Sequence, residues 1–597
     1  MNNHEEIYCY KDYKMKRLLL FHHYNKYNSI SEYVLYCLHV VRKYFDFIVF
    51  TSNSYLSKEE KNLLKKKYCN IVLIRENKGF DFGAWKYAIN FLGFKKIKNY
   101  DCLVIMNDTC FGPLFDIGEV FKIMEEKSVD FWGITNHRKT PDGMPGTNDP
   151  IPEHIQSYFI CFNKKVISSK IFQKFWLNVD KNLMDVNKVI QNYETKLTEL
   201  LKKEGFTYDV WIETSNFNVK YTNVLLFHPD ILLELGLPFI KIKSFLGDFE
   251  NPKRLLFIIK NKYKYPIHLI ENHISKIIPP NSTLYFKNLF IDKAENTITS
   301  TGWKNVAICL HITSIKDFCK HIDLFTKAKS EYNLFISTDS FKKIKEIKNI
   351  LINNDIYDKI KIKDILIIQK NNLYPLISFF EFIKNEYDII GYFHIKKYFC
   401  FYKRIWSYSI RKRMFNIDNI IQVFIKNNNI GIIIPDIPDL ILRNKLNWGK
   451  KNDMYTKLWS FLKCSKEFRV DKYHFPIMPF ETMFWYRREA FQLLCDLNIN
   501  NIKEMKEKLF LKEEDILKAI EKLLIYIAWD KNFDYRILTL KNTNISNMEK
   551  IDKVIRLRKR SKIYKWLKIF FEKGALYTIK LIIMEIKSNR PIKPPLV

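Results

Sequence analysis

The feature that most restricts the fold of this chain is an alternation of short apolar runs with segments of helical apolar spacing. In the first part of the chain the apolar runs cover residues 17–22, 47–50, 71–74 and 102–106. Short, continuously apolar runs between helices are typical of parallel strands that are covered on both faces. Because such strands are joined by right-handed crossovers, the alternation predicts a doubly wound, Rossmann-like α/β unit.

The same alternation returns later in the chain. Apolar runs at residues 305–310, 332–337, 364–368 and 387–394 follow one another in the same order as the first four. We interpret this recurrence as an internal duplication. The predicted fold class is therefore α/β, with two tandem Rossmann-like domains followed by a helical, basic C-terminal segment.

Four regions are expected along the chain: a first domain at 1–240, a connecting segment at 241–300, a second, divergent domain at 301–500, and a helical region at 501–597. The last region carries the basic run 556–560, followed by aromatic and aliphatic residues at helical spacing. This pattern fits a core-packing helix with a solvated basic side, or a basic amphipathic helix on an anionic membrane. We favour the membrane because the basic run adjoins the aromatic stripe.

The net charge is +33, with 98 Lys and Arg residues against 65 Asp and Glu. A field of this sign favours anionic partners such as nucleic acid, an acidic membrane face or phosphorylated substrates, without choosing among them. We expect no nucleic-acid partner, because the chain has neither a zinc module nor a recognisable RNA-binding motif and its basic residues are dispersed.

The 11 cysteines are scattered and form no C-x-x-C pair, which indicates a reducing compartment and no structural zinc. Met1 is followed by acidic and polar residues rather than by the basic and apolar stretches of a signal peptide. No apolar run has the length of a transmembrane helix. These observations predict a cytoplasmic protein.

The first candidate binding segment follows the third apolar run and contains Asn77, Gly79, Asp81 and Gly83. Ligands of open α/β sheets collect at the carboxyl ends of the strands. The two glycines permit close approach of the backbone, and Asp81 can accept hydrogen bonds from a ribose or a base. The alternative is an ordinary glycine turn with a capping Asp, since the spacing matches neither a dinucleotide fingerprint nor a phosphate loop.

The second candidate segment contains Asn107 and Asp108, directly after a fully apolar run and before Gly112-Pro113. A carboxylate at a strand end can hold Mg²⁺ or Mn²⁺ against a diphosphate, because the phosphates supply most of the oxygen ligands. The ion would offset the charge that builds on a leaving nucleoside diphosphate. The alternative is Asp108 as a helix cap or turn residue.

Two later segments complete the candidates. His154 and Gln156 lie in a polar cluster that leads into an apolar run, where they can line a pocket or serve a structural purpose. An inverting glycosyl transfer needs a carboxylate base for the acceptor hydroxyl. Glu194 is the first candidate for this base, with Asp209 and Glu213 as alternatives, although a Glu at the start of a helix also benefits from the helix dipole.

Taken together, these segments resemble the rhamnan synthesis F protein family. The matching stretches are Asn77–Trp85, Asn107–Thr109 with Gly112-Pro113, Asp130–Thr135 and His154–Phe159, and a looser match continues through His394–Lys397, Gly431–Pro435 and Met483–Arg487.

The resemblance implies a GT-A type glycosyltransferase of cell-wall or lipopolysaccharide rhamnan assembly, with dTDP-L-rhamnose as donor and a lipid-linked glycan as acceptor. The first half is also similar to the inverting family 2 glycosyltransferases. By that similarity Asn77, Gly79 and Asp81 flank the nucleotide and Asp108 holds the metal. The usual acidic pair is reduced here to Asn107-Asp108, which puts metal dependence in doubt.

The second half departs from this pattern. Residues 371–375 follow its third apolar run without a glycine, and His394-Ile395-Lys396-Lys397 stands where Asp108 stands in the first half. Lysines at this position can bind a diphosphate directly or form a solvated basic edge. We favour a degenerate or acceptor-binding second domain over a second active transferase.

The leading hypothesis is thus a cytoplasmic rhamnosyltransferase, peripheral on the inner face of the cytoplasmic membrane. The alternative is a catalytically inactive, transferase-derived membrane scaffold.

Overall fold

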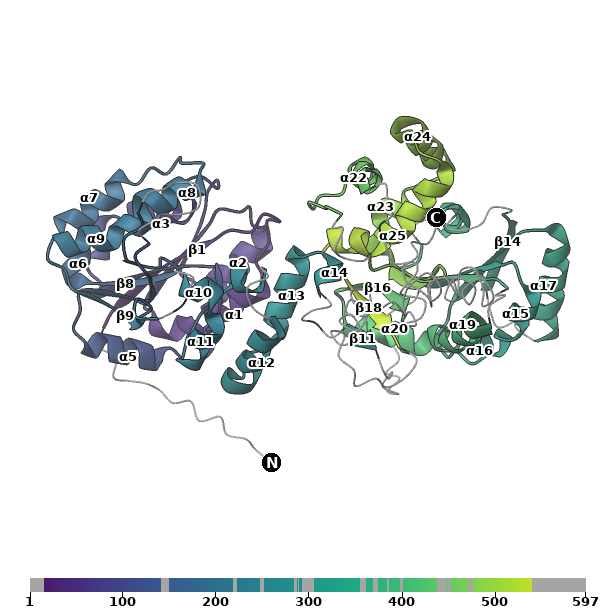
Figure 1. Cartoon of the computed structure of the whole chain (residues 1–597), viewed down its shortest axis with the longest axis horizontal. Coiled ribbons are helices and arrows are strands. Elements are labelled where there is room, and N and C mark those ends of the chain that lie inside the picture. Colours follow the sequence, from purple (N-terminus) through teal and green to yellow (C-terminus); the bar gives the residue numbers. More distant parts are fainter. Residues whose placement is uncertain are drawn as a thin grey trace, which may run out of the picture. The chain divides into compact units, whose positions relative to one another are not determined.

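The computed structural model describes residues 15–140, 150–217, 219, 223–246, 252–283, 287, 289–291, 305–354, 361–368, 374–383, 386–397, 401–436, 448, 452–470 and 476–539 (Figure 1). The chain divides into two compact units, Met1–Ile274 and Ser275–Val597. This division lies within the segment 241–300 that the sequence suggests as a connection. The predicted amphipathic helix after residue 556 and residues 371–373 lie outside the described part of the chain.

Unit 1 is built on a mixed sheet with the strand order β3-β2-β1-β4-β8-β6-β7, in which β9 also pairs with β6. β1, β2, β3 and β4 run parallel to one another, whereas β8 runs antiparallel to both β4 and β6. The strands are β1 (Arg17–His23), β2 (Phe47–Ser52), β3 (Ile71–Ile74), β4 (Cys102–Asn107), β6 (Phe131–His137), β7 (His154–Ile155), β8 (Phe159–Asn163) and β9 (Tyr208–Ile212), with β5 (Cys110–Phe111) and β10 (Ile240–Lys241) paired separately.

Helices cover both faces of this sheet, with α3, α7 and α9 on one side and α5 and α11 on the other (Figure 1). The helices are α1 (Glu32–Val41), η1 (Arg42–Tyr44), α2 (Lys58–Lys67), α3 (Phe80–Leu92), α4 (Phe94–Ile97), α5 (Gly118–Glu126), α6 (Lys164–Ser168), α7 (Lys170–Asn178), α8 (Val186–Val189), η2 (Ile190–Glu194), α9 (Thr195–Lys203), α10 (Val224–Phe227), α11 (Pro229–Glu234), η3 (Ile242–Phe245), α12 (Pro252–Tyr263) and α13 (His268–Ile277).

Local sequence explains where α2 begins and why β1 and β4 are buried. Ser57 caps α2 in a capping box: its hydroxyl accepts from the Glu60 N–H, and the Glu60 carboxylate accepts from the Ser57 N–H. β1 and β4 are apolar on both faces because each lies inside the sheet, and all of their residues are buried. Aromatic side chains of α3 and α7, among them Trp85 and Trp176, pack against them in the core.

Unit 2 repeats this architecture. Its sheet has the order β11-β18-β16-β17-β15-β12-β13-β14, so that β14-β13-β12-β15 reproduces β3-β2-β1-β4 with the same parallel pairing. An antiparallel strand follows in each case, β17 here and β8 in unit 1. The strands are β11 (Phe290–Ile291), β12 (Val306–Ile312), β13 (Asn333–Thr338), β14 (Lys361–Ile367), β15 (Ile389–Ile395), β16 (Ile430–Pro435), β17 (Met483–Arg487) and β18 (Asp534–Leu538). The prediction of an α/β fold with two tandem Rossmann-like domains is confirmed, while the predicted basic C-terminal segment lies outside the described residues.

Residues 501–539 belong to the sheet and core of unit 2, although the sequence pattern suggests a separate helical region there. β18 pairs with β16, and α25 is buried along most of its length. The helices of this unit are α14 (Pro280–Thr283), α15 (Ile315–Cys319), α16 (Ile322–Thr326), α17 (Phe341–Asn353), α18 (Tyr374–Ile383), α19 (Phe401–Met414), α20 (Ile417–Lys426), α22 (Asn452–Phe461), η4 (Arg488–Phe491), α23 (Gln492–Cys495), α24 (Ile499–Leu509) and α25 (Glu513–Asp530).

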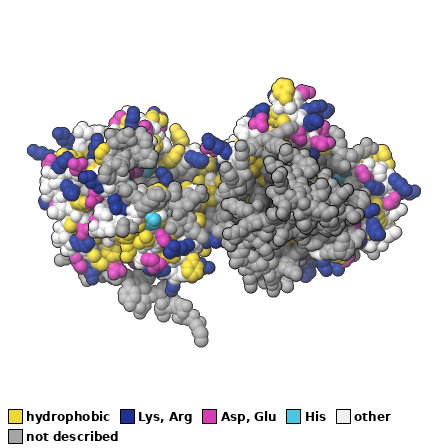
Figure 2. Space-filling view, viewed as in Figure 1, with side chains coloured by type: hydrophobic (Ala, Val, Ile, Leu, Met, Phe, Trp, Pro, Cys, Tyr) yellow, Lys and Arg dark blue, Asp and Glu magenta, His cyan; other side chains and the backbone are white. Residues whose placement is uncertain are grey.

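Two surface properties bear on the expected partners. Within the described part of the chain, no helix combines the length and the apolar character that crossing a membrane requires. On the described surface of unit 1 in Figure 2, Lys and Arg side chains lie interspersed with Asp and Glu rather than gathered in one stripe. This face therefore lacks the continuous basic track that nucleic-acid-binding proteins use.

Candidate active site of unit 1

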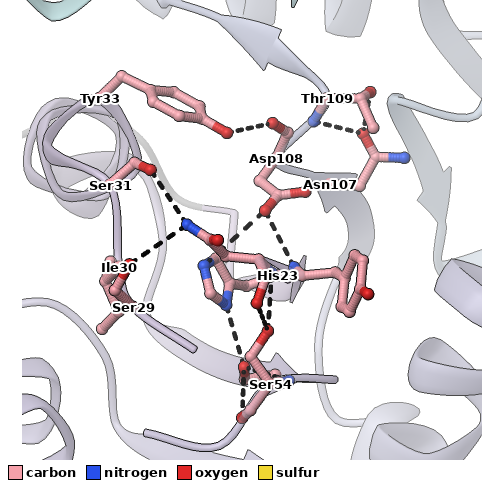
Figure 3. A network of polar contacts seen from close by, with 12 residues as sticks. His23, Ser29, Ile30, Ser31, Tyr33, Ser54, Asn107, Asp108 and Thr109 are labelled. Atoms are coloured by element: carbon pink, nitrogen blue, oxygen red, sulfur yellow. Dashed lines mark hydrogen bonds and ion pairs between the residues drawn. The ribbon is translucent and has the colours of Figure 1, made fainter. Parts of the chain in front are cut away.

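Asp108 lies directly after β4, beside the end of β1. The pairing of His22 with Asn107 in the sheet brings the next residues, His23 and Asp108, together. The Asp108 carboxylate accepts a hydrogen bond from the Tyr24 N–H at 3.0 Å, and its Oδ2 lies 3.9 Å from His23 Nε2. Figure 3 shows Asp108 facing the turn after β1, with His23, Tyr33 and Thr109 around it.

One hydrogen bond holds the backbone of Asp108, and another contact fixes the neighbouring His23. The Tyr33 hydroxyl donates to the Asp108 carbonyl at 2.7 Å, and His23 Nδ1 lies 3.0 Å from the Ser52 hydroxyl on β2. Burial raises the pKa of Asp108 to about 7, against the hydrogen bond from Tyr24. Asp108 thus has a structural part in fixing the turn after β1, and it is also a carboxylate whose charge is costly in its present surroundings.

The segment with Asn77, Gly79, Asp81 and Gly83, called the glycine segment below, lies on the other side of the candidate site. Gly79 has φ +65°, and a Cβ there would lie 2.8 Å from the Lys181 carbonyl oxygen, so that only glycine fits. Its N–H donates to the Leu183 carbonyl at 2.6 Å. A Cβ on Gly83 would lie 2.9 Å from the Lys78 carbonyl oxygen. Both glycines therefore allow the chain to fold back tightly at the start of α3.

Asn53, which follows β2, ties this segment to the sheet. Its amide nitrogen donates to the Asn77 side chain at 3.0 Å and to the Phe80 carbonyl at 3.2 Å. Arg75 donates to the Asn53 side-chain oxygen at 3.1 Å and to the Lys78 carbonyl at 2.6 Å. Asn77 thus has a definite place in the polar framework at the carboxyl ends of β2 and β3.

Asp81 connects the glycine segment with Asp108. The Asn107 amide donates to one Asp81 oxygen at 3.1 Å, while the Phe82 N–H donates to the other at 2.9 Å. Burial and then the negative charge of Glu194 raise the pKa of Asp81 to about 6. The side chains predicted from two separate segments, Asp81 and Asn107, are therefore in direct contact.

Glu194 lies at the end of η2 and faces the same edge. One of its oxygens accepts from the Ser157 N–H at 2.9 Å and from the Ser157 hydroxyl at 2.8 Å. Burial acts to raise the pKa of Glu194, but the nearby His154, the Ser157 hydrogen bonds and Lys241 outweigh it and hold the pKa below its ordinary value. Glu194 is thus an ionised, oriented carboxylate beside Asp81.

His154 and Gln156 lie on and after β7 at the same end of the sheet. The His154 ring stacks on His137 with 5.2 Å between centroids, and its Nδ1 donates to the Pro152 carbonyl at 2.8 Å. The Gln156 side-chain oxygen accepts from the Thr135 hydroxyl at 2.8 Å. His154 acts on the site through its proximity to Glu194, whereas Gln156 is engaged in a buried hydrogen-bond network.

Asp209 and Glu213 occupy opposite ends of β9. Asp209 pairs with Trp132 at the start of β6, at the amino edge of the sheet, and forms a 2.8 Å ion pair with Lys127. Asp209 therefore lies at the amino edge of the sheet, whereas the other candidates lie at or near its carboxyl edge. Glu213 follows the carboxyl end of β9, where it accepts hydrogen bonds from Asn136 and from the Ser215 N–H.

Lys241 also lies at the candidate site, although the sequence pattern showed no sign of it. Its Nζ donates to the Thr109 hydroxyl at 3.0 Å and lies 4.9 Å from the centroid of the Tyr158 ring. Its charge acts to lower the pKa of Asp81, Asp108 and Glu194 alike. Lys241 reaches this place because β10 pairs antiparallel with β5, directly after Asp108. Among 98 basic residues, nothing in the sequence singles it out.

The carboxylates at this edge suit a divalent ion that is held mainly by phosphate oxygens. Within the described residues, no three His, Cys, Asp or Glu side chains form a metal-binding cluster. A Mg²⁺ or Mn²⁺ ion on a diphosphate needs only one or two protein carboxylates. Asp108 meets this requirement, and Asp81 lies near enough for its charge to act on Asp108.

The curated relatives match only part of the chain. The uncharacterized protein y4gN of Sinorhizobium fredii (strain NBRC 101917 / NGR234) is 30% identical over 159 residues, covering 27% of this chain and 39% of y4gN. Virulence protein VirA of Vibrio anguillarum (strain ATCC 68554 / 775) is 27% identical over 146 residues, covering 24% of this chain and 43% of VirA. Each match therefore spans less than half of the relative.

Among solved structures, the glycosyltransferase GlyE of Streptococcus pneumoniae TIGR4 aligns over 67% of this chain and 90% of GlyE. Its sequence identity is 12% and its TM-score is 0.24, values at which the likeness carries no functional argument. A comparison with protein families matches residues 48–533 to rhamnan synthesis protein F. Because this match spans most of the chain, the protein belongs to the rhamnan synthesis protein F family.

Proposed function

We propose that this protein is a glycosyltransferase that moves a sugar from a nucleoside diphosphate donor to a glycan acceptor, with its active site in unit 1. The observation that carries the proposal is the meeting of Asp81, Asp108, Glu194 and Lys241 at the carboxyl edge of the parallel strands. Three carboxylates and a lysine there supply the groups that binding a diphosphate and activating a hydroxyl require. Membership of a rhamnan synthesis family supports the same reaction class.

The donor nucleotide would lie over the glycine segment. Gly79 and Gly83 bring the backbone close to the ligand, Asn77 is held in the framework around Asn53, and Asp81 offers a carboxylate. Asp108, with Asp81 near it, would hold a divalent ion. When bound, this ion supplies a positive charge that stabilises the departing diphosphate.

Lys241 would contribute to the same stabilisation without a metal. Its ammonium group is fixed by the Thr109 hydroxyl and by the Tyr158 ring, directly beside Asp108. A cation that is already positioned stabilises developing negative charge without having to reorganise during the reaction. We therefore assign Lys241 to the phosphates of the leaving group.

Glu194 would act as the general base. Its pKa is held below the ordinary value, so the carboxylate is ionised at neutral pH and ready to accept the proton of the acceptor hydroxyl. The two hydrogen bonds from Ser157 fix one of its oxygens, which leaves the other to meet the acceptor. Attack by the activated hydroxyl on the face opposite the diphosphate would invert the anomeric carbon.

The family also suggests the substrates. We propose L-rhamnose as the transferred sugar, dTDP-L-rhamnose as its donor and a lipid-linked glycan as the acceptor, and membership of a family named for rhamnan synthesis supports the choice of sugar. Such an acceptor requires the enzyme to work at the inner face of the cytoplasmic membrane. The net charge of +33 fits attraction to an anionic lipid surface.

The test is nucleotide release by the purified full-length protein from a panel of sugar nucleotides, with and without Mg²⁺ or Mn²⁺ and with membrane extract as acceptor source. Asp108→Asn and Lys241→Gln should each lower release at least about 100-fold, the loss typical of removing one electrostatic stabiliser. Asp209→Asn, which removes a carboxylate at the opposite edge of the sheet, is the matched control and should retain activity.

Two results would contradict the proposal. Release that persists in folded Asp108→Asn and Lys241→Gln proteins would move the active site away from this edge. No release from any donor, with the extract shown to be competent by a control transferase, would favour a membrane scaffold that has kept the fold without the reaction.

A further inference from the structure

The end of β15 in unit 2 corresponds residue by residue to the end of β4 in unit 1. His23 on β1 lies 3.0 Å from Ser52 on β2, and His311 on β12 lies 2.8 Å from Ser337 on β13 in the same arrangement. In unit 1 the partner of this histidine on the next strand is Asp108. In unit 2 His311 pairs with His394, whose ring centroid lies 4.8 Å away. An imidazole therefore stands where unit 1 has its carboxylate.

The charges around the two positions differ: a carboxylate and a lysine act on Asp108, whereas a lysine and an arginine act on His394. Asp108 has the carboxylate of Asp81 near it, whereas His394 has Lys396 and Arg411, and both of these cations act to lower its pKa. Arg411 reaches in from α19 and donates to the His394 carbonyl at 3.2 Å. The carboxylates of unit 1 therefore suit a cation bound together with a diphosphate, whereas the cations of unit 2 suit an anion directly.

Three described carboxylates lie close to the residues of this edge, and each is paired with a lysine: Asp339 acts on His311, Asp317 interacts with Arg411 and pairs with Lys320, and Glu481 pairs with Lys396. Lys396 forms a 2.6 Å ion pair with Glu481, and Lys343 forms a 2.7 Å ion pair with Asp339. His394 is 4% exposed, and its Nδ1 is buried without a hydrogen-bond partner, as is Nε2 of His311. Buried polar atoms of this kind normally have a partner, so their presence points to a ligand or to solvent that completes the site.

We propose that the carboxyl edge of β12 and β15 in unit 2 is a second ligand site, which binds a phosphate or diphosphate group through Lys396, Arg411 and His394 without a divalent ion. Lysine and arginine bind phosphate oxygens directly, and a neutral imidazole can donate to them. The positive charge that a divalent ion would supply in unit 1 would here come from the side chains. The phosphate can belong to a nucleotide or to the lipid carrier of the acceptor.

The test uses the full-length protein with Lys241→Gln, so that unit 1 contributes little, and measures calorimetric binding of inorganic pyrophosphate in EDTA. Lys396→Gln should weaken binding on the order of tenfold, the loss expected of a charge-assisted contact. Glu481→Gln should strengthen binding, because it releases Lys396 from its competing carboxylate. Lys508→Gln removes a lysine from an exposed ion pair with Glu504 and should change nothing.

Lys396→Gln and Glu481→Gln should change the pyrophosphate affinity in opposite directions. An ion pair with a purely structural role would instead lower the affinity of both variants. Two results would overturn the proposal: absence of pyrophosphate binding, or an equal loss in Lys396→Gln and Lys508→Gln. Competition by thymidine diphosphate and by farnesyl diphosphate then identifies the source of the phosphate, since the tighter competitor resembles the natural ligand. This binding is measured without turnover, so its failure would leave the transferase proposal for unit 1 intact.

Discussion

Two buried imidazoles, His311 on β12 and His394 on β15, make the free energy of unfolding depend on pH. Burial lowers the pKa of His311 to about 4 and that of His394 to about 2, whereas an unfolded histidine titrates near 6.5. At pH values between the folded and the unfolded pKa, the unfolded chain binds protons that the folded chain does not. The stability contributed by neutral burial is therefore present above about pH 6.5 and is lost as the pH falls below it.

We predict that lowering the pH from about 7.5 to about 5 costs about 2 kcal/mol of unfolding free energy for each of these two histidines. His394→Asn, which keeps a neutral polar side chain, should reduce the total loss by about that amount. Denaturant titrations of wild type and variant at both pH values measure the difference. His39→Asn, at an exposed position, is the control, and equal pH dependence in wild type and His394→Asn would contradict this account.

Only some residues of the candidate site in unit 1 could be predicted from the sequence. Asp81, Asn107 and Asp108 follow apolar strands, and the carboxyl ends of parallel strands meet at one edge, so their proximity follows from the sequence pattern. Lys241 could not be found in this way, because it arrives through the short antiparallel pairing of β10 with β5. Asp209 was misleading because the sequence does not reveal which end of β9 carries it.

At the scale of elements, the start of α3 depends on the conformation of one glycine. Gly79 has φ +65° and lies against the Lys181 carbonyl, so an added methyl group is strained by both backbone and contact. Gly205 has φ +82° as well, but a Cβ there would meet no atom within 4 Å. The two positions share the backbone conformation and differ in the contact.

We predict that Gly79→Ala lowers the free energy of unfolding by about 2 to 3 kcal/mol and weakens donor binding, whereas Gly205→Ala costs about 1 kcal/mol and leaves donor binding unchanged. Denaturant titration and calorimetric titration with dTDP provide the two readouts. Equal effects of the two substitutions would show that backbone conformation alone matters and that the close packing against Lys181 does not shape the site.

The boundaries of most strands could be predicted because a continuous apolar run is buried as a whole. The runs at 71–74 and 102–106 coincide with β3 and β4 to within one residue. The order of strands beyond β4 and β15 could not be predicted, since β8 and β17 enter antiparallel between neighbours that are distant in sequence. For the same reason α25 and β18 were not recognised as parts of the second sheet.

At the scale of the whole molecule, the duplication has produced two edges of different chemistry. Unit 1 keeps Asp108 and gathers further carboxylates, whereas unit 2 keeps the histidine–serine pair and replaces the carboxylate with His394. We propose metal-assisted transfer for the edge of unit 1 and binding of an anion for the edge of unit 2.

The most direct test of the central claim is transfer of labelled rhamnose from dTDP-L-rhamnose into lipid-extractable material by wild type and by Glu194→Gln, with donor binding measured in parallel. We expect transfer by wild type and a loss of about 100-fold to 10,000-fold in kcat for Glu194→Gln, the usual contribution of a general base, with donor affinity nearly unchanged. Full transfer by a folded Glu194→Gln protein would contradict the assignment of this edge as the active site.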